Sequence, residues 1–232
     1  MPRVLLFDVN ETLLDLRALD PAFERVFGEA GARQAWFGQL LQSALLATVT
    51  DAYADFGTIA RAALGMIAAR RGVALTADDQ AEILGGIRTL PPYPEVRQSL
   101  ERLRGAGMRL AALTNSTAAV AEAQLANAGL RDLFEQALSA DAVRRLKPAP
   151  EAYRMAADLL GVAVGDVRLV AAHSWDVAGA LRAGCAAAFV ARPGMVLDPL
   201  APVPDVVGAD LREVADRLLE IELGAAHAGS WP

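Results

Sequence analysis

The chain has 232 residues and a formal net charge of −6, with 54% hydrophobic and 22% charged residues. This composition excludes disorder over most of the length and suffices to bury a core without disulfides or metal. The acidic balance and the lack of a basic cluster argue against nucleic acid and anionic membrane surfaces as partners. The length fits one large domain, or a core domain with a smaller insertion.

Cysteine use and the N-terminus both bear on where the protein works. A single cysteine, Cys185, excludes an intrachain disulfide and is typical of a reducing compartment. The N-terminus enters an apolar segment directly, without the basic region of a signal peptide. No apolar run approaches the roughly 20 residues that span a bilayer. We therefore expect a cytoplasmic protein.

The first part of the chain predicts one strand and then helices. Residues 3–9 predict a buried strand because they are few, apolar and partly β-branched. Asp20-Pro21 indicates a helix start, and Thr76 with Asp79 indicates a capping box. Helices are expected at about 21–30, 33–50, 56–71 and 76–88, which makes residues 12–90 helical.

After a proline-rich linker at 91–94, strands and helices alternate. This alternation is typical of a parallel sheet in an open α/β fold. Ser116 or Thr117 is expected to cap the helix that follows it, and residues 225–232 are expected to be loose. Strands are expected at 108–114, 136–139, 167–172, 187–190 and 205–207, and helices at 95–105, 118–128, 150–160, 176–183 and 209–222. The prediction is an α/β core over 1–11 and 92–232 with a helical cap at 12–91.

Polar side chains follow several of the predicted strands. Because the carboxyl ends of parallel strands form one edge, these side chains should share a pocket. The pocket would contain the chain's single lysine, whose compact ammonium differs chemically from the arginines used everywhere else. These residues are Asp8, Thr114, Asn115, Lys147, His173 and Asp176.

Two carboxylates and a lysine in one pocket indicate covalent hydrolysis. One carboxylate can act as a nucleophile and form an ester intermediate. The lysine neutralises and orients it, and the second carboxylate can activate the water that hydrolyses the ester.

Four segments, in this order, resemble the four motifs of the haloacid dehalogenase superfamily. The resemblance covers most of the chain, including the cap after the first strand. It implies a Rossmann-like core and makes Asp8 the nucleophile. The segments are Phe7-Asp8-Val9-Asn10-Glu11-Thr12-Leu13, Leu113-Thr114-Asn115-Ser116, Lys147-Pro148 and Asp176.

The motifs also favour one branch of that superfamily. Its magnesium-dependent phosphatases carry a second aspartate where this chain has Asn10, and an amide cannot act as a general acid. The fourth motif has one carboxylate, whereas Mg²⁺ requires several oxygen ligands. We therefore expect no metal and no cofactor. Trp175-Asp176-x-x-Gly179-Ala180 and the helical cap resemble the type II 2-haloacid dehalogenases, hydrolases whose aspartate displaces halide from the α-carbon of a short 2-haloalkanoic acid.

The resemblance implies a role for each of the motif residues. Thr114, Asn115 and Lys147 would lie near the nucleophile and the substrate carboxylate, and Asp176 with Lys147 would act on the hydrolytic water. His173 could donate to a leaving group or orient water. The residues expected to bind the small anionic substrate are Asn10, Thr12, Trp36, Phe56 and Trp175.

The chain departs from the dehalogenase pattern at four positions. The family usually has Tyr where Asn10 stands, Gly where Glu11 stands and Asn where His173 stands. Phe37 occupies the place of the arginine that accepts the departing halide, unless Arg33 or Gln39 substitutes. Losing one such donor typically costs about 2.7–4 kcal/mol of transition-state stabilisation.

These departures leave alternatives open. The chain could be a dehalogenase with a modified halide pocket, for instance for fluoride. It could instead be a related hydrolase acting on a non-halogenated carbon electrophile such as a strained-ring amino acid. A phosphatase is a weaker alternative because of Asn10 and the fourth motif. A non-catalytic protein of this fold is also weaker, because burying the charges of Asp8, Lys147 and Asp176 without a purpose is costly. The apolar segment 39–49 could form a homodimer interface or cap core, of which we favour the core.

Overall fold

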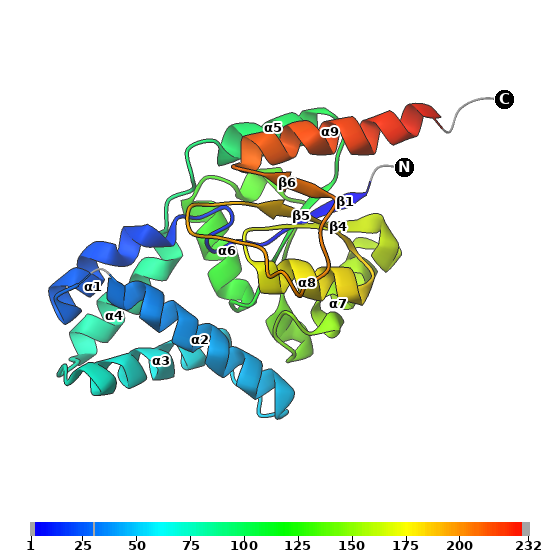
Figure 1. The fold of residues 1–232 in the computed structure, drawn as a ribbon. Helices are drawn as coiled ribbons and strands as arrows, with labels where there is room; N and C mark the ends of the chain where they lie inside the picture. The colour runs from blue at the N-terminus through cyan, green and yellow to red at the C-terminus, as the bar shows by residue number, and fades with distance from the viewer. Residues whose placement is uncertain (1–2, 30, 229–232) are drawn as a thin grey trace.

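The computed structural model describes residues 3–29 and 31–228, with side chains as far as residue 222. Its core is one six-stranded parallel sheet in the order β3-β2-β1-β4-β5-β6 (Figure 1). The strands are β1 (Val4–Phe7), β2 (Leu110–Thr114), β3 (Gln136–Ser139), β4 (Val167–Ala171), β5 (Ala186–Val190) and β6 (Val206–Gly208).

The first strand lies in the middle of the sheet. Leu5 pairs with Leu110 of β2 on one side and with Arg168 of β4 on the other. Strands β1, β2 and β4 are buried throughout, as expected for a parallel sheet covered by helices on both faces. The chain order reverses at β1, so the crevice beyond its carboxyl end is where such folds place ligands.

Helices cover both faces of the sheet. Figure 1 shows α5 beside α9 above the strands and α7 with α8 below them. Helix α6 follows β2 and packs near β3. The bounds are α5 (Val96–Gly105), α6 (Ala118–Asn127), α7 (Pro150–Leu160), α8 (Ser174–Ala183) and α9 (Leu211–Ala228).

Four helices between β1 and β2 form a separate group at one side of the sheet (Figure 1). Trp36 is fully buried among them, where it packs 5.3 Å from Phe23 between ring centroids and donates from Nε1 to the Ala60 carbonyl oxygen at 2.9 Å. The group is α1 (Asp20–Phe27), α2 (Gly31–Val49), α3 (Phe56–Arg71) and α4 (Ala77–Gly86). The helical insertion between these strands has the expected place and composition, while the domain limits themselves stay a prediction.

Local signals located the element ends well. The helix start at Asp20-Pro21 and the capping box of Thr76 with Asp79 are both present. The proline-rich segment after the 3-10 helix Ile87–Thr89 packs onto the first loop, since the Tyr93 N–H donates to the Leu13 carbonyl oxygen. These contacts fix the point at which the chain re-enters the sheet.

Three expectations need correction. The tail is not loose at residues 225–228, because the alanine-rich segment extends α9 to Ala228; residues 229–232 lie outside the described part. Thr117 is the residue that precedes α6, but its side chain makes no capping hydrogen bond. Within 39–49, Leu40 is buried as cap core, whereas Leu46 and Val49 are 64% and 79% exposed.

No helix in the described residues is long and apolar enough to cross a membrane.

Candidate active site

The carboxylate of Asp8 stands directly after β1 and has a partner for each oxygen. Lys147 Nζ donates to Oδ1 at 2.8 Å, and Thr12 Oγ1 donates to Oδ2 at 2.7 Å. His173 Nδ1 lies 3.2 Å from the same Oδ2. Burial alone would raise the pKa of Asp8, but the positive charges of Lys147 and His173 outweigh it and hold the pKa well below its ordinary range. The carboxylate is therefore ionised at neutral pH.

Lys147 is 2% exposed and is held by both its ends. Its Nζ donates to Asp176 Oδ2 at 2.6 Å and to the Leu113 carbonyl oxygen at 3.0 Å, besides Asp8. Asn115 fixes its backbone, because Oδ1 accepts from the Lys147 N–H at 2.7 Å and Nδ2 donates to the Lys147 carbonyl oxygen at 3.3 Å. Burial lowers the pKa of Lys147, yet the two carboxylates outweigh it and raise the pKa. The ammonium is thus a permanent charge beside Asp8.

Asp176 is fully buried on the far side of Lys147. Its Oδ1 accepts a hydrogen bond from the Tyr153 hydroxyl at 2.5 Å. Burial, together with the charge of Asp8, raises the pKa of Asp176 in spite of the lysine. The α8 backbone approaches closely at Gly179, where a Cβ would stand 2.5 Å from Pro148 and 2.7 Å from the Tyr153 hydroxyl. Tyr153 carried no signal in the sequence, because its role depends on α7 packing against α8.

Two threonines order the loops around the carboxylate. Thr12 Oγ1 accepts from the Ala172 N–H at 2.9 Å while it donates to Asp8, so it joins the loop after β1 to the loop after β4. Thr114 ends β2, and its Oγ1 accepts from the Ser116 N–H at 3.2 Å. Thr12, expected to bind substrate, donates its hydroxyl to the Asp8 carboxylate.

His173 lies between two carboxylates. Besides the contact with Asp8, its Nε2 is 3.0 Å from Glu11 Oε2. Charged carboxylates accept hydrogen bonds, so the contacts of both ring nitrogens with carboxylate oxygens favour the doubly protonated imidazolium. Burial lowers the pKa of His173, but these two hydrogen bonds outweigh it and raise the pKa to about 9. The histidine is therefore a second cation at the nucleophile.

Glu11 reaches His173 from a backbone with φ +60°, a conformation that favours glycine. Its other oxygen lies 3.5 Å from Arg33 Nη1, and Arg33 Nε donates to Asp20 Oδ1 at 2.5 Å. An alternating chain of charges thus runs from Asp8 to the cap. Two departures from the dehalogenase pattern, Glu11 and His173, form a single pair.

Asn10 and Phe37, the other two departures from the dehalogenase pattern, also lie near Asp8 and His173. Asn10 Oδ1 accepts from the buried Gln124 Nε2 at 2.8 Å. The ring of Phe37 lies 6.0 Å from that of His173, and the ring of Trp175 stacks on His173 with 5.1 Å between the ring centroids. Gln124, which no sequence signal marked, sets the orientation of the Asn10 amide.

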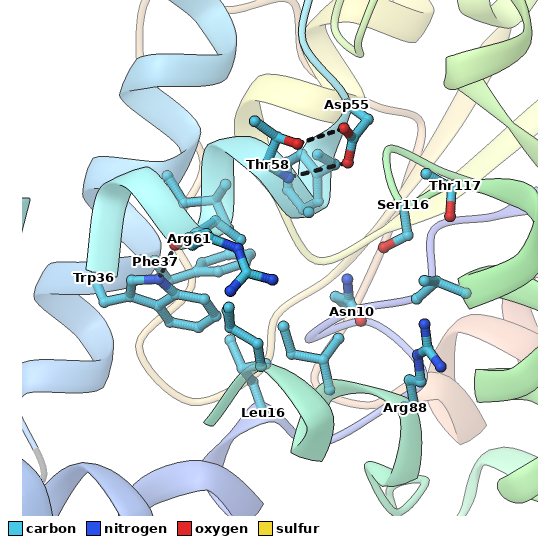
Figure 2. Close-up of a pocket in the computed structure, with 17 residues that line it drawn as sticks. Asn10, Leu16, Trp36, Phe37, Asp55, Thr58, Arg61, Arg88, Ser116 and Thr117 are labelled. Carbon is cyan, nitrogen blue, oxygen red and sulfur yellow. Dashed lines mark hydrogen bonds between the residues drawn. The ribbon is translucent and has the colours of Figure 1, made fainter. Parts of the chain in front are cut away.

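Two cavities open beside the nucleophile. The smaller, of about 10 Å³, has room for about one water molecule. Its walls are Asp8, Asn10, Phe37, Leu41, Phe56, Thr114, Asn115, Lys147, His173 and Trp175. The larger, of about 310 Å³, shares Asn10, Phe37 and Phe56 with it and extends toward Trp36 (Figure 2).

The lining of the two cavities shows which of the expected site residues face them and which do not. Asp176 and Thr12 are absent from the described lining of both cavities and act through Lys147 and Asp8. Arg33 and Gln39 also lie outside these two linings, but Arg33 lines a third cavity together with Phe37 and His173. Among the described residues, no group of three or more His, Cys, Asp or Glu side chains is arranged to hold a metal ion.

A family model described as haloacid dehalogenase-like hydrolase matches residues 2–184. The chain belongs to this family. The hydrolase is 33% identical over 194 residues to an (S)-2-haloacid dehalogenase of Xanthobacter autotrophicus, covering 83% of this chain and 76% of that one. It is 29% identical to an (S)-2-haloacid dehalogenase of Pseudomonas sp. strain YL, over 96% and 97% of the two chains.

Solved structures agree with the sequence comparison. The hydrolase resembles the L-2-haloacid dehalogenase of Xanthobacter autotrophicus with chloropropionic acid covalently bound, with a TM-score of 0.88 and 29% identity. The similarity covers 95% of this chain and 99% of that structure. The expected family and the parallel α/β fold are therefore confirmed.

Proposed function

We propose that this hydrolase is a 2-haloacid dehalogenase in which Asp8 displaces halide from the α-carbon of a short 2-haloalkanoic acid. The observation that carries the proposal is an ionised aspartate, paired with a buried lysine, at the wall of a small and largely apolar cavity. The relatives named as (S)-2-haloacid dehalogenases support the same reaction. A carboxylate that is ionised but shielded from bulk water is a competent nucleophile toward carbon.

In the first step an Asp8 oxygen attacks the α-carbon. A carbon–oxygen bond forms, the carbon–halogen bond breaks, and the halide leaves with the bonding electron pair. Lys147 and Thr12 hold the carboxylate in one orientation, and Asn115 holds Lys147. Phe56 and Trp175 exclude water from the reacting carbon.

His173 takes the role that the missing arginine leaves open. The ester that forms on Asp8 carries no negative charge, so His173 Nδ1–H loses its ionic acceptor as the halide acquires charge. The same N–H can then donate to the halide, with Phe37 and Trp175 enclosing it. The indole Nε1–H of Trp175 is buried and has no acceptor among the described residues, which makes it a second candidate donor. A localised donor in a narrow cavity favours a small halide such as fluoride.

In the second step water attacks Cγ of the Asp8 ester. The bond between Cγ and the substrate oxygen breaks, the 2-hydroxy acid leaves, and Asp8 is restored. As the water attacks, Lys147 Nζ passes one proton to Asp176, whose raised pKa suits a proton acceptor, and takes up the proton that the water loses, so Lys147 stays an ammonium. The second proton of the water goes to the departing substrate oxygen. Haloacid and water thus yield hydroxy acid, halide and a proton that returns to solvent.

The cellular location and the oligomeric state of the enzyme both stay predictions. A cytoplasmic location is supported by the single cysteine, which is buried and free. A homodimer is supported by the exposed apolar end of α2, formed by Leu45, Leu46 and Val49. Sedimentation of the purified protein measures the second directly.

The test is halide release in EDTA without added metal. Purified protein is incubated with fluoroacetate, L-2-chloropropionate and p-nitrophenyl phosphate, with Asp8→Asn as the control. We expect fluoride or chloride release that Asp8→Asn abolishes, and no phosphate release. Absence of both halides would overturn the assignment and favour a non-halogenated carbon electrophile. Phosphate release dependent on Mg²⁺ would instead indicate a phosphatase.

A further inference from the structure

The larger cavity carries more positive charge than a three-carbon acid requires. Arg61 on α3 and Arg88 in the 3-10 helix Ile87–Thr89 both line it. Figure 2 shows Arg61 extending from α3 into the cavity opposite Asn10, with Arg88 on the other rim. Within the described chain, neither guanidinium makes a side-chain hydrogen bond or ion pair. Both arginines are solvent-exposed at the rim of the cavity, where two cations without counterions can bind an anion together.

Neutral donors converge on the same space. The Oδ1 of Asn10 is occupied by Gln124, which leaves its Nδ2 free to donate, and no described residue accepts from it. The hydroxyls of Ser116 and Thr117 lie on the core side of the cavity (Figure 2). The Thr117 hydroxyl does not cap α6. The cavity is therefore lined by donors that the folded protein itself does not use.

The acidic residue in the described lining is already engaged. Asp55 precedes α3, and its Oδ1 accepts from the Thr58 N–H at 3.0 Å while its Oδ2 accepts from the Thr58 hydroxyl at 2.6 Å. It makes no ion pair with either arginine, so its single negative charge only partly offsets their two positive charges. The charge of the cavity stays positive.

The cavity is also continuous with the nucleophile's surroundings. It shares Asn10, Phe37 and Phe56 with the small cavity at Asp8, so the two cavities adjoin each other. Its volume of about 310 Å³ is in the range of pockets that bind drug-sized ligands and exceeds what a three-carbon acid fills. A substrate reacting at Asp8 would extend its far end toward Arg61 and Arg88.

We propose that the cavity is a subsite for a second carboxylate at the far end of the substrate, so that the preferred substrates are 2-halo dicarboxylic acids. Arg61 and Arg88 bind the distal carboxylate, and Asn10 marks the passage between the two cavities. This inference rests on the proposed function, of which it specifies the substrate class. The reaction at the α-carbon is unchanged.

The test compares 2-bromopentanoate with 2-bromopentanedioate, which have the same chain length and differ in the terminal carboxylate. We expect wild-type protein to show a KM at least about tenfold lower for the dicarboxylate. Arg61→Gln and Arg88→Gln should each raise that KM about threefold to fivefold and change the KM for 2-bromopentanoate less than about twofold, since one solvent-exposed carboxylate–guanidinium pair contributes up to roughly that factor. Arg70→Gln, an exposed arginine on the same helix, is the matched control and should change neither.

Calorimetric binding of pentanedioate and pentanoate, which contain no halogen, tests the carboxylate subsite separately from the dehalogenase reaction. If no bromide is released but pentanedioate binds more tightly and loses that advantage in Arg61→Gln, the subsite holds and the dehalogenase assignment fails. If bromide is released without preference for the dicarboxylate, the subsite is overturned. Equal losses for both acids in Arg61→Gln would also overturn it, because the arginine would then bind the carboxylate next to the reacting carbon.

Discussion

The two sides of the Asp8 carboxylate are built differently. On one side Lys147, Asn115, Asp176 and Tyr153 all come from the α/β core, and each charge has a direct partner within it. On the other side His173 depends on Glu11, whose second partner Arg33 belongs to the cap helix α2. The Lys147 side of Asp8 is therefore formed without the cap helices, whereas the His173 side is linked through Glu11 and Arg33 to the cap helix α2. The residues that match the family motifs lie on the first side, and the departures Glu11, His173 and Phe37 lie on the second.

The core side should be the more sensitive to a single change. Lys147→Met leaves Asp8 and Asp176 as neighbouring buried carboxylates without a cation. We expect a loss of about 3–5 kcal/mol in the free energy of unfolding, the usual consequence of removing one member of a buried ion pair. Urea denaturation at pH 7 measures it, with Arg70→Met as the exposed control. A loss below about 1 kcal/mol would contradict a charge network formed in the core.

On the cap side, His173→Asn tests the leaving-group role. It places the usual family residue opposite Phe37 without restoring an arginine. We expect kcat/KM for halide release to fall by about 10²–10³, as when one preorganised donor is removed. The double variant Phe37→Arg with His173→Asn should recover part of the rate for chloride. An unchanged rate in the single variant would show that His173 does not touch the leaving group.

Glu11→Gln sharpens the comparison through pH. The pKa of His173 stands at about 9, above its ordinary 6.5, so the stability from its charge is complete below pH 6.5 and is lost as pH rises through 9. Removing the Glu11 charge should move both the alkaline fall in kcat/KM and the loss of stability to lower pH. Rate and unfolding profiles between pH 6 and 10 measure this. Coincident profiles for the two proteins would contradict the pairing.

The smallest effect concerns the Glu11 backbone. Glu11→Gly and Glu11→Ala both remove the carboxylate, but only glycine adopts φ +60° without strain. We expect the glycine variant to be more stable than the alanine variant by about 1 kcal/mol. Thermal unfolding of the two proteins side by side tests it. Equal stability would mean that the turn relaxes when its side chain is lost.

The same division decides what the sequence could predict. Strand ends and motif spacing located Asp8, Thr114, Asn115 and Lys147, because their positions follow from the order of parallel strands. The pairing of Glu11 with His173 could not be predicted, since it depends on one positive φ angle and on a ring orientation. Tyr153 and Gln124 were missed for the related reason that helix packing, rather than any local pattern, brings them to the site.

The covalent ester on Asp8 is the central claim, and oxygen labelling tests it directly. A single turnover of L-2-chloropropionate by excess enzyme in H₂¹⁸O is followed by mass spectrometry of the Asp8 peptide and of the lactate. Because water attacks Cγ of Asp8, we predict ¹⁸O in the Asp8 carboxylate and none in the lactate hydroxyl. Label in the lactate and none in the peptide would mean that water attacks the substrate carbon, and would contradict the role of Asp8 as nucleophile.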